Sequence, residues 1–202
     1  PLSNSSSRRS VPMMSLVEVM KWPVTPSPKS TSALTSSSVA ALLALADMPK
    51  SGSAFFIHEA LASGKIGEDR WLRDAAISAA AQQEEGFLEV VAQQSREKLK
   101  VPADVVTIVA EHVARNAPSD LRQLLHLMKS ADASATQPIL AGLLKGWPKD
   151  KRLSLDETSE ASLLELLSKL PPASRGVLVN LATRWGSKAL ESHVAEIAKG
   201  FE

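Results

Sequence analysis

From residue 38 onward, apolar residues recur along the chain with the spacing of α-helices. Three sets show this spacing: Leu121, Leu124, Leu125 and Met128; Leu178, Leu181, Ala182 and Trp185; and Leu190, Val194, Ile197 and Phe201. Each set forms one apolar stripe along a helix, and such a stripe has to be buried against a neighbour. No stretch alternates apolar and polar residues convincingly, as a half-buried strand does, so strands are not expected. The pattern predicts an all-α protein.

Short breaks that contain Gly, Pro, Ser or Asn divide this part of the chain into about ten helices. The predicted spans are 38–48, 53–63, 70–82, 86–98, 102–115, 118–130, 135–146, 155–169, 172–185 and 187–199. They pair into about five helical hairpins, because short connections make consecutive helices antiparallel. Two architectures fit such hairpins, a stacked α-solenoid and a compact helical bundle. The connection at 145–155 is longer, polar and basic, and we expect it to be a hinge.

Signals at the helix ends agree with these spans. The segments Ser154–Glu157 and Ser134–Gln137 have the spacing of capping boxes, in which a hydroxyl and a Glu or Gln side chain satisfy exposed amides reciprocally. Pro102 and Pro118 fit the first turn of a helix, where the missing N–H is not needed. Gly200 suits a C-terminal cap.

Residues 1–37 differ in composition from the rest of the chain. They contain 11 Ser, 3 Thr and 5 Pro, with few large apolar side chains. Too little apolar surface is available there to offset the entropy lost on ordering, so we predict a disordered tail. The alternative is that this stretch does not belong to the native reading frame. The helical domain is therefore expected at 38–202.

The segment 67–81 resembles the second helix of a HEAT-type repeat. That helix begins with an acidic turn, followed by an apolar residue, an Arg and then Ala residues at helical spacing. Here Asp69 is expected to cap the helix, and Arg73 to reach a carboxylate or a neighbouring turn. The Ala residues that follow leave a smooth face, which an adjacent helix can approach closely. Of the two architectures we therefore favour a short HEAT-like α-solenoid.

A narrower resemblance depends on four short segments, at 69–75, 146–148, 170–176 and 181–191. Taken in this order, they resemble the helical-repeat segment of large multidomain proteins from planctomycetes and related bacteria, often labelled membrane-bound dehydrogenase-like or haem-binding. In that family a β-propeller precedes the helical segment, and a c-type cytochrome or copper-binding domain can follow it. The resemblance implies a fragment of a larger exported redox-associated protein, at the periplasm or cell surface; without it, a cytoplasmic location would be expected. This chain has neither the propeller nor the haem motif, so any redox chemistry would lie outside these residues.

The residue types that catalysis or metal binding requires are not gathered into recognisable motifs. The absence of Cys excludes disulfides, thiolate-bound metal clusters and a Cys nucleophile within this chain. The four His residues lack metal-ligand spacing, and no Gly-rich phosphate loop is present. Acidic residues at 84–85 and 156–160 are interpreted as solvated helix ends, where they favour the helix dipole. No catalytic, metal-binding or cofactor-binding residue is assigned, and no cofactor is expected.

Three of the Trp residues lie near basic residues and are candidates for interaction sites. Trp185 completes an apolar stripe, which favours burial. Trp147 lies in the polar connection, which makes it the better candidate for an exposed anchor of a partner. The structural or interaction candidates are Asp69, Trp71, Arg73, Trp147, Arg184 and Trp185.

Charge and hydropathy narrow the class of partner. Residues 51–202 carry 18 basic and 20 acidic side chains, a balance that does not favour nucleic-acid binding. No apolar run approaches the roughly 20 residues needed to span a bilayer. We expect a non-catalytic scaffold or spacer that contacts other proteins or neighbouring domains of its own parent chain. The alternative is a HEAT-like repeat enzyme acting on DNA or a chromophore, which a basic concave patch around a buried carboxylate would favour.

Overall fold

The computed structural model describes residues 31–48, 52–66, 69–95, 100–118 and 121–192, and these residues form helices and connections without a strand. The helices of this described part are α1 (Thr31–Asp47), α2 (Ser53–Ala62), α3 (Arg70–Gln82), α4 (Glu84–Gln94), α5 (Ala103–Asn116), α6 (Arg122–Ser130), α7 (Ala133–Gly146), α8 (Glu157–Lys169) and α9 (Pro172–Trp185). Residues 188–192 are also helical. The chain divides into two units, 1–34 and 35–202, and the fold that follows is that of the second unit. The prediction of an all-α protein is confirmed for the described residues.

Most predicted spans agree with the observed helices to within a few residues. The clearest difference is at the beginning, where α1 includes residues 31–37, which were predicted to belong to a disordered tail. The helix propensities of Ser and Thr lie only a few tenths of a kcal/mol below those of good helix formers, so a Ser/Thr-rich composition does not by itself prevent a helix. The rest of the predicted tail, 1–30, lies outside the described residues.

The N-terminal caps are Asp residues rather than the predicted hydroxyls. Helix α8 is capped by Asp156, whose Oδ1 accepts a hydrogen bond of 2.8 Å from the backbone N–H of Ser159. Helix α7 is capped by Asp132, whose Oδ1 accepts a hydrogen bond of 2.8 Å from the backbone N–H of Ser134. The predicted capping boxes at 154–157 and 134–137 are therefore wrong by two residues in each case. Asp caps as well as Ser does, and its charge also favours the positive end of the helix dipole.

The two Pro residues differ in their fit to the prediction. Pro102 directly precedes α5 as its N-cap residue, one position before the first turn. Pro118 lies in the connection after α5, and α6 does not begin until Arg122. Helix α5 ends at Asn116, and the next residue, Ala117, has a positive φ of 43° that interrupts the helical path. The predicted cap at Gly200 lies outside the described residues.

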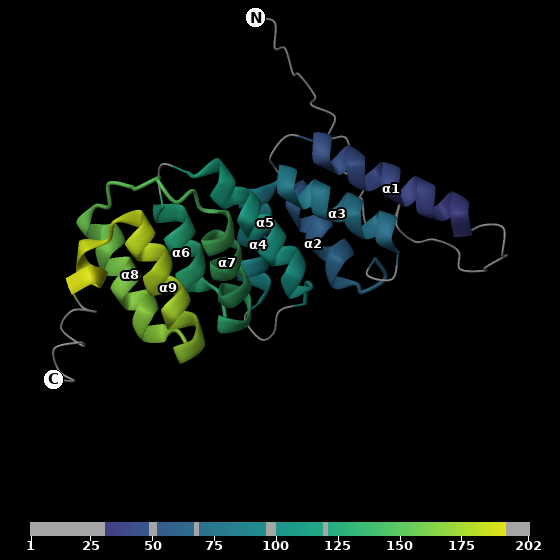
Figure 1. Ribbon diagram of the computed structural model, residues 1–202. Helices are drawn as coiled ribbons and strands as arrows, with labels where there is room; N and C mark the ends of the chain where they lie inside the picture. Colours follow the sequence, from purple (N-terminus) through teal and green to yellow (C-terminus); the bar gives the residue numbers. More distant parts are fainter. Residues whose placement is uncertain (1–30, 49–51, 67–68, 96–99, 119–120, 193–202) are drawn as a thin grey trace, which may run out of the picture. The chain divides into compact units, whose positions relative to one another are not determined.

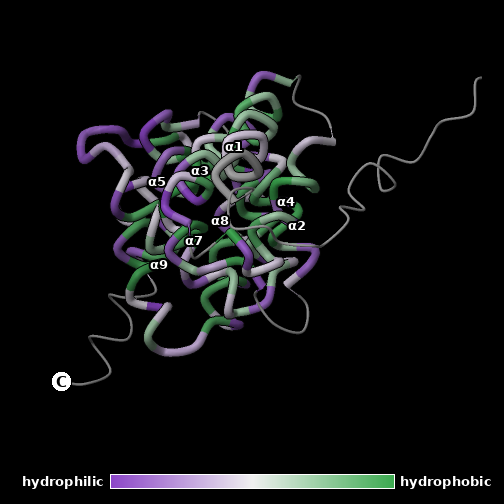
Figure 2. The backbone as a smooth tube through the Cα atoms, turned by 90° about the vertical axis from the view of Figure 1, so that its right-hand side faces the viewer, coloured by the Kyte–Doolittle hydropathy of each residue, from purple (hydrophilic) through white to green (hydrophobic). Residues whose placement is uncertain are grey.

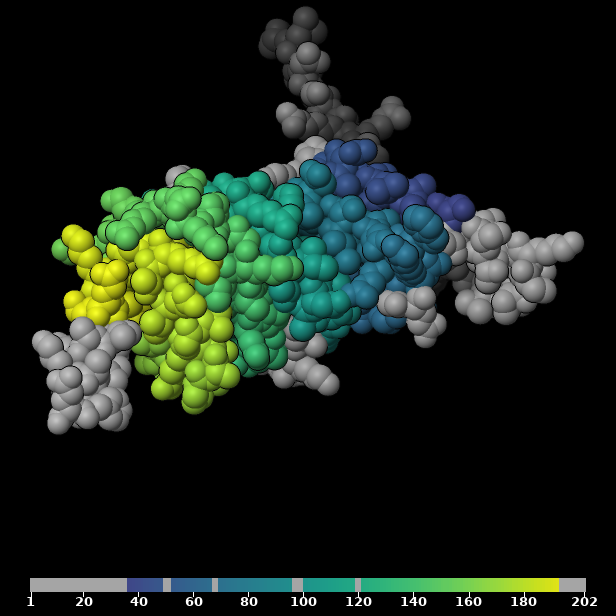
Figure 3. Space-filling view, viewed as in Figure 1, coloured from purple at the N-terminus to yellow at the C-terminus, as the bar shows by residue number. Residues whose placement is uncertain are grey.

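Each helix from α4 to α7 packs against its second neighbours in the sequence. Helices α2, α4, α6 and α8 contact one another in this order, and so do α3, α5, α7 and α9. We call these the even set and the odd set. The sets are joined by contacts between α2 and α3, α3 and α4, α4 and α5, α4 and α7, and α8 and α9. As a consequence, segments that are close in the sequence cover adjacent parts of this unit (Figures 1 and 3).

The predicted apolar stripes face the core. Buried members are Leu121, Leu124, Leu125 and Met128 of one stripe, Leu178, Leu181, Ala182 and Trp185 of another, and Leu190 of the third. The remaining members of the third stripe, at 194, 197 and 201, lie outside the described residues. Figure 2 shows hydrophobic stretches along the helices, including α2 and α4, and hydrophilic stretches at many of the connecting turns.

Helices α5 and α7 make the most extensive contact in the described unit, because both present small residues to each other. A Cβ atom at Gly142 would lie 2.3 Å from a backbone oxygen of α5 and 2.7 Å from the Cβ of Ala110. A Cβ atom at Gly146, one turn further along, would lie 2.3 Å from another backbone oxygen of α5 and 3.0 Å from the Cβ of Ala114. Only glycine fits at these two positions of α7.

Candidate functional site

Three of the predicted interaction residues lie at the beginning of α3. The Oδ1 atom of Asp69 accepts hydrogen bonds from the backbone N–H groups of Trp71 (2.8 Å) and Leu72 (3.2 Å), so Asp69 caps α3 as expected. The guanidinium group of Arg73 pairs with the carboxylate of Asp104 at the start of α5, which gives Arg73 the carboxylate partner that the sequence predicts. The side chain of Trp71 is 73% exposed. Two of these residues therefore stabilise local structure, while Trp71 is available to solvent.

The other three candidates lie together where α7 and α9 end. Trp147 is only 2% exposed, so the prediction that it is an exposed anchor is wrong. Its indole N–H donates to the carbonyl oxygen of Lys151 (3.0 Å), and its ring meets that of Trp185 edge-on, with centroids 5.4 Å apart. Trp185 is fully buried, as predicted. Arg184 donates from Nη1 to a backbone oxygen of α7 at 2.9 Å, so this group holds α7 against α9.

The connection after α7 is tied to the rest of the unit by polar contacts. The backbone N–H of Leu153 donates to the carbonyl oxygen of Trp185 at 3.0 Å. The ammonium group of Lys151 donates to the carbonyl oxygen of Ala117 at 2.7 Å. Together with the edge-on contact to Trp185, these bonds hold the connection close to Trp147, which is buried although its neighbours in the sequence are polar. The hinge expected at 145–155 stays a prediction.

Glu84 is not the solvated helix end that the sequence suggests. Its side chain is only 13% exposed, and its Oε2 atom lies 2.6 Å from Nδ1 of His112 on α5. The amide of Asn116, also on α5, donates to the same carboxylate at 3.2 and 3.3 Å. This cluster fastens the first turn of α4 to α5. No Ser, Thr or Lys nucleophile is among the hydrogen-bond partners of these three side chains in the described residues.

A second carboxylate, Glu160 on α8, binds the start of the helical segment at 188–192. It accepts hydrogen bonds from the hydroxyl of Ser187 and from the backbone N–H of Lys188 (3.0 Å). It thus satisfies an N–H group that a helix start leaves without a partner. The acidic residues at 156–160 therefore cap helices, and they do so through contacts that differ from the predicted box.

One buried acidic residue lies on α5. Glu111 is 7% exposed, and it pairs with Lys145 of α7 at 2.7 Å and with Arg115 one turn further along α5. The hydrogen bond from Lys145 is the main cause that lowers the pKa of Glu111 below its usual value. Both cations are largely exposed. This cluster adds an ionic contact to the close approach of α5 and α7.

The described surface has a groove of about 540 Å³, lined mainly by α4 and α6 of the even set, with further residues from α2, α5 and the connection after α5. Its two walls are formed by polar side chains on α4 and α6: Glu85, Glu89 and Gln93 on α4, and Gln123, His126 and Ser130 on α6. The residues on α4 are spaced four apart, so they lie above one another along one side of the helix. Its floor includes the buried residues Leu88, Ala92 and Leu124.

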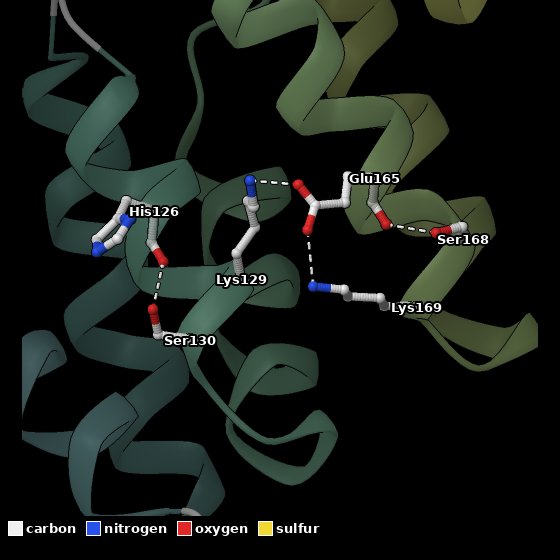
Figure 4. A network of polar contacts seen from close by, with 6 residues as sticks. All are labelled: His126, Lys129, Ser130, Glu165, Ser168 and Lys169. Atoms are coloured by element: carbon white, nitrogen blue, oxygen red, sulfur yellow. Dashed lines mark hydrogen bonds and ion pairs between the residues drawn. The ribbon is translucent and has the colours of Figure 1, made fainter.

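The charge of this groove is negative. No Lys or Arg is among the described residues that line it. On α6, Lys129 pairs with Glu165 of α8, while the ring of His126 points away from that pair (Figure 4). The ammonium groups of Lys129 and Lys169 lower the pKa of Glu165 to about 2 through their hydrogen bonds. Lys129 is thus paired with α8 and not with the groove, and neither Glu85 nor Glu89 has an ion-pair partner among the described residues.

Sequence reasoning missed this groove, although one signal was available. Glu85, Glu89 and Gln93 form a polar stripe on a helix whose opposite side is apolar. A solvated face gives the same pattern, so the stripe alone does not reveal that α6 stands opposite it. Among the described residues, no group of three or more acidic or His side chains is arranged to hold a metal ion. None of the helices in this part of the chain is long and apolar enough to cross a bilayer.

No protein-family model matches this sequence, and no curated protein and no solved structure is similar to it. No relative therefore links the chain to the planctomycete-type dehydrogenase-like proteins. The function has to be argued from the geometry of the described residues.

Proposed function

We propose that this chain is a non-catalytic scaffold of the HEAT-like α-solenoid type, whose groove between α4 and α6 binds a segment of another protein. The alternating contacts of the even and odd sets support the solenoid part of this proposal. In a solenoid each helical hairpin contacts only the hairpins before and after it, and stacking the hairpins buries a continuous core between them. Such stacks carry extended surfaces that bind protein segments.

The groove is the observation that supports a binding role. Its volume of about 540 Å³ lies within the roughly 300–1,000 Å³ range of ligand sites. The apolar floor can bury the side chain of a bound residue, and the amide groups of Gln93 and Gln123 can exchange hydrogen bonds with a peptide backbone. An apolar floor between polar walls is the usual anatomy of a site for a protein segment.

The charge of the groove disfavours the alternative, an enzyme that acts on DNA. Nucleic acids are bound mainly by Lys and Arg side chains that neutralise phosphates. The described lining residues include two unpaired carboxylates and no Lys or Arg, so a phosphate chain would be repelled there. The role as a spacer in a larger exported redox-associated protein, implied by the planctomycete resemblance, stays a separate prediction.

The proposal is tested by selecting binders from a library of random peptides displayed on phage, with the purified full chain as the target. Enriched peptides are then measured against two variants. Gln93→Trp places a bulky side chain on the wall of the groove, and Gln137→Trp places the same side chain on an exposed position of α7 in the odd set. We expect the peptides to lose binding to Q93W and to keep it for Q137W. Failure to enrich any peptide, or equal binding to both variants, would refute the proposal.

A further inference from the structure

We infer that the groove between α4 and α6 selects an extended basic segment in which Lys or Arg alternates with an apolar residue. This inference rests on the proposed function, and it adds the chemistry of the partner. It follows from three features of the groove: the spacing of its two carboxylates, the absence of Lys and Arg from its described lining, and the position of its apolar residues.

The spacing of the two carboxylates matches an extended chain. Glu85 and Glu89 are four residues apart on α4, which corresponds to about 6 Å along the helix axis. Residues i and i+2 of an extended peptide are about 6.6 Å apart and point to the same side. An extended segment that runs along α4 can therefore place one cation opposite each carboxylate.

The described residues supply no Lys or Arg to these two carboxylates. Of the two such residues on α6, Lys129 is turned to Glu165 of α8 (Figure 4), and Arg122 is not among the residues that line the groove. Among the described residues, Glu89 accepts one neutral hydrogen bond, from the amide of Gln93 at 3.2 Å. Both carboxylates belong to exposed residues on the wall of a groove, so a bound Lys or Arg gains their attraction without displacing an existing ion pair.

The floor determines what lies between the two cations. Successive side chains of an extended peptide point to opposite sides. When residues i and i+2 face α4, residue i+1 faces the α6 side of the groove, where Leu124 and Leu127 lie among the polar residues of that wall. Leu124 is buried and Leu127 is partly buried, so this side offers apolar surface. The recognised pattern is therefore basic, apolar, basic.

The test uses fluorescein-labelled peptides and fluorescence anisotropy with the full chain. One peptide carries a central Arg-Leu-Arg, the second has the same composition with Leu-Arg-Arg, and the third carries Glu-Leu-Glu, all between identical neutral flanks. The protein variants are E85Q/E89Q and the matched control E157Q/E191Q, which removes two exposed carboxylates outside the groove and so changes the net charge equally.

We expect Arg-Leu-Arg to bind best, and each groove carboxylate to contribute about threefold in affinity, or about tenfold for the double variant. Binding should also weaken when NaCl is raised from about 0.05 M to about 0.5 M, because exposed ion pairs are screened. The control variant should bind as the parent does. Equal affinity of E85Q/E89Q and the parent, or of Arg-Leu-Arg and Leu-Arg-Arg, would overturn the inference. If library peptides bind in the groove without any preference for basic residues, only this inference fails; if none binds there, the proposed function fails.

Discussion

Replacing Gly142 by Ala tests whether the close approach of α5 and α7 holds the fold together. The new Cβ would lie 2.3 Å from the backbone oxygen of Thr107 and 2.7 Å from the Cβ of Ala110. Neither atom is the end of a flexible side chain, so the two helices would have to move apart by about 1 Å to restore normal contact distances.

The expected loss of stability follows from two opposing effects. Overpacking a well-packed core costs about 1–3 kcal/mol, and a clash with the backbone belongs at the upper end of that range. Ala is favoured over Gly inside a helix by about 1 kcal/mol, which offsets part of this cost. We therefore expect G142A to lower the free energy of unfolding by about 2 kcal/mol, or the Tm by about 4–8 °C for a domain of this size.

Gly176 provides the matched control. It lies inside α9, and a Cβ atom there would meet nothing within 4 Å. The same Gly-to-Ala change should therefore raise the free energy of unfolding by about 0.5–1 kcal/mol, from helix propensity alone. Urea unfolding followed by circular dichroism measures both variants. If G142A were as stable as the parent, or more stable, the account of the α5–α7 contact would be wrong, because propensity alone predicts the same sign at both positions.

Three further predictions concern single side chains, each measured by urea unfolding. Trp147→Ala should destabilise the protein by about 3–5 kcal/mol because it empties a buried site, whereas Trp71→Ala at an exposed site should change stability by less than about 0.5 kcal/mol. Asp156→Ala should cost about 1 kcal/mol through loss of the α8 cap, whereas Ser154→Ala should cost almost nothing; the opposite order would restore the predicted capping box. The lowered pKa of Glu165, about 2, means that its contribution to stability is complete above its unfolded pKa of about 4.3 and is lost as the pH falls towards 2. Glu165→Gln should therefore lose less stability than the parent between about pH 5 and pH 2, and an identical acid dependence would contradict the ion pairs with Lys129 and Lys169.

The helices could be predicted from the sequence because their signals are local. The stripe that contains Leu124 and Leu125 requires one buried side on a helix, whichever neighbour covers it. The cap at Asp69 is equally local, since the side chain bonds to amides two and three residues ahead. Where two local signals competed, as at Ser154 and Asp156, the sequence did not indicate which residue would cap the helix. Both are good N-caps, and only the place where the helix starts decides between them.

Residues whose environment depends on distant segments could not be predicted. Trp147 has polar neighbours in the sequence, yet it is buried because Trp185, 38 positions later, packs against its ring. Glu84 is read as a solvated helix end until α5 brings His112 within 2.6 Å of its carboxylate. The groove is the extreme case, because it exists only through the placement of α6 opposite α4. Local periodicity reports that a face is polar and not what stands in front of it.

The close contact in the odd set and the groove in the even set have a common origin in side-chain size. Gly142 and Gly146 allow α7 to approach the backbone of α5, whereas α4 and α6 contact each other less extensively and place the larger residues Leu88 and Leu124 in the groove between them. Helices packed through larger side chains are spaced up to about 2 Å wider than those packed through small ones. Since α4 also contacts α5, a tight odd set and a wider even set open the space between α4 and α6 on the even side. The glycines that stabilise one side of the unit therefore also help to shape the groove on the other.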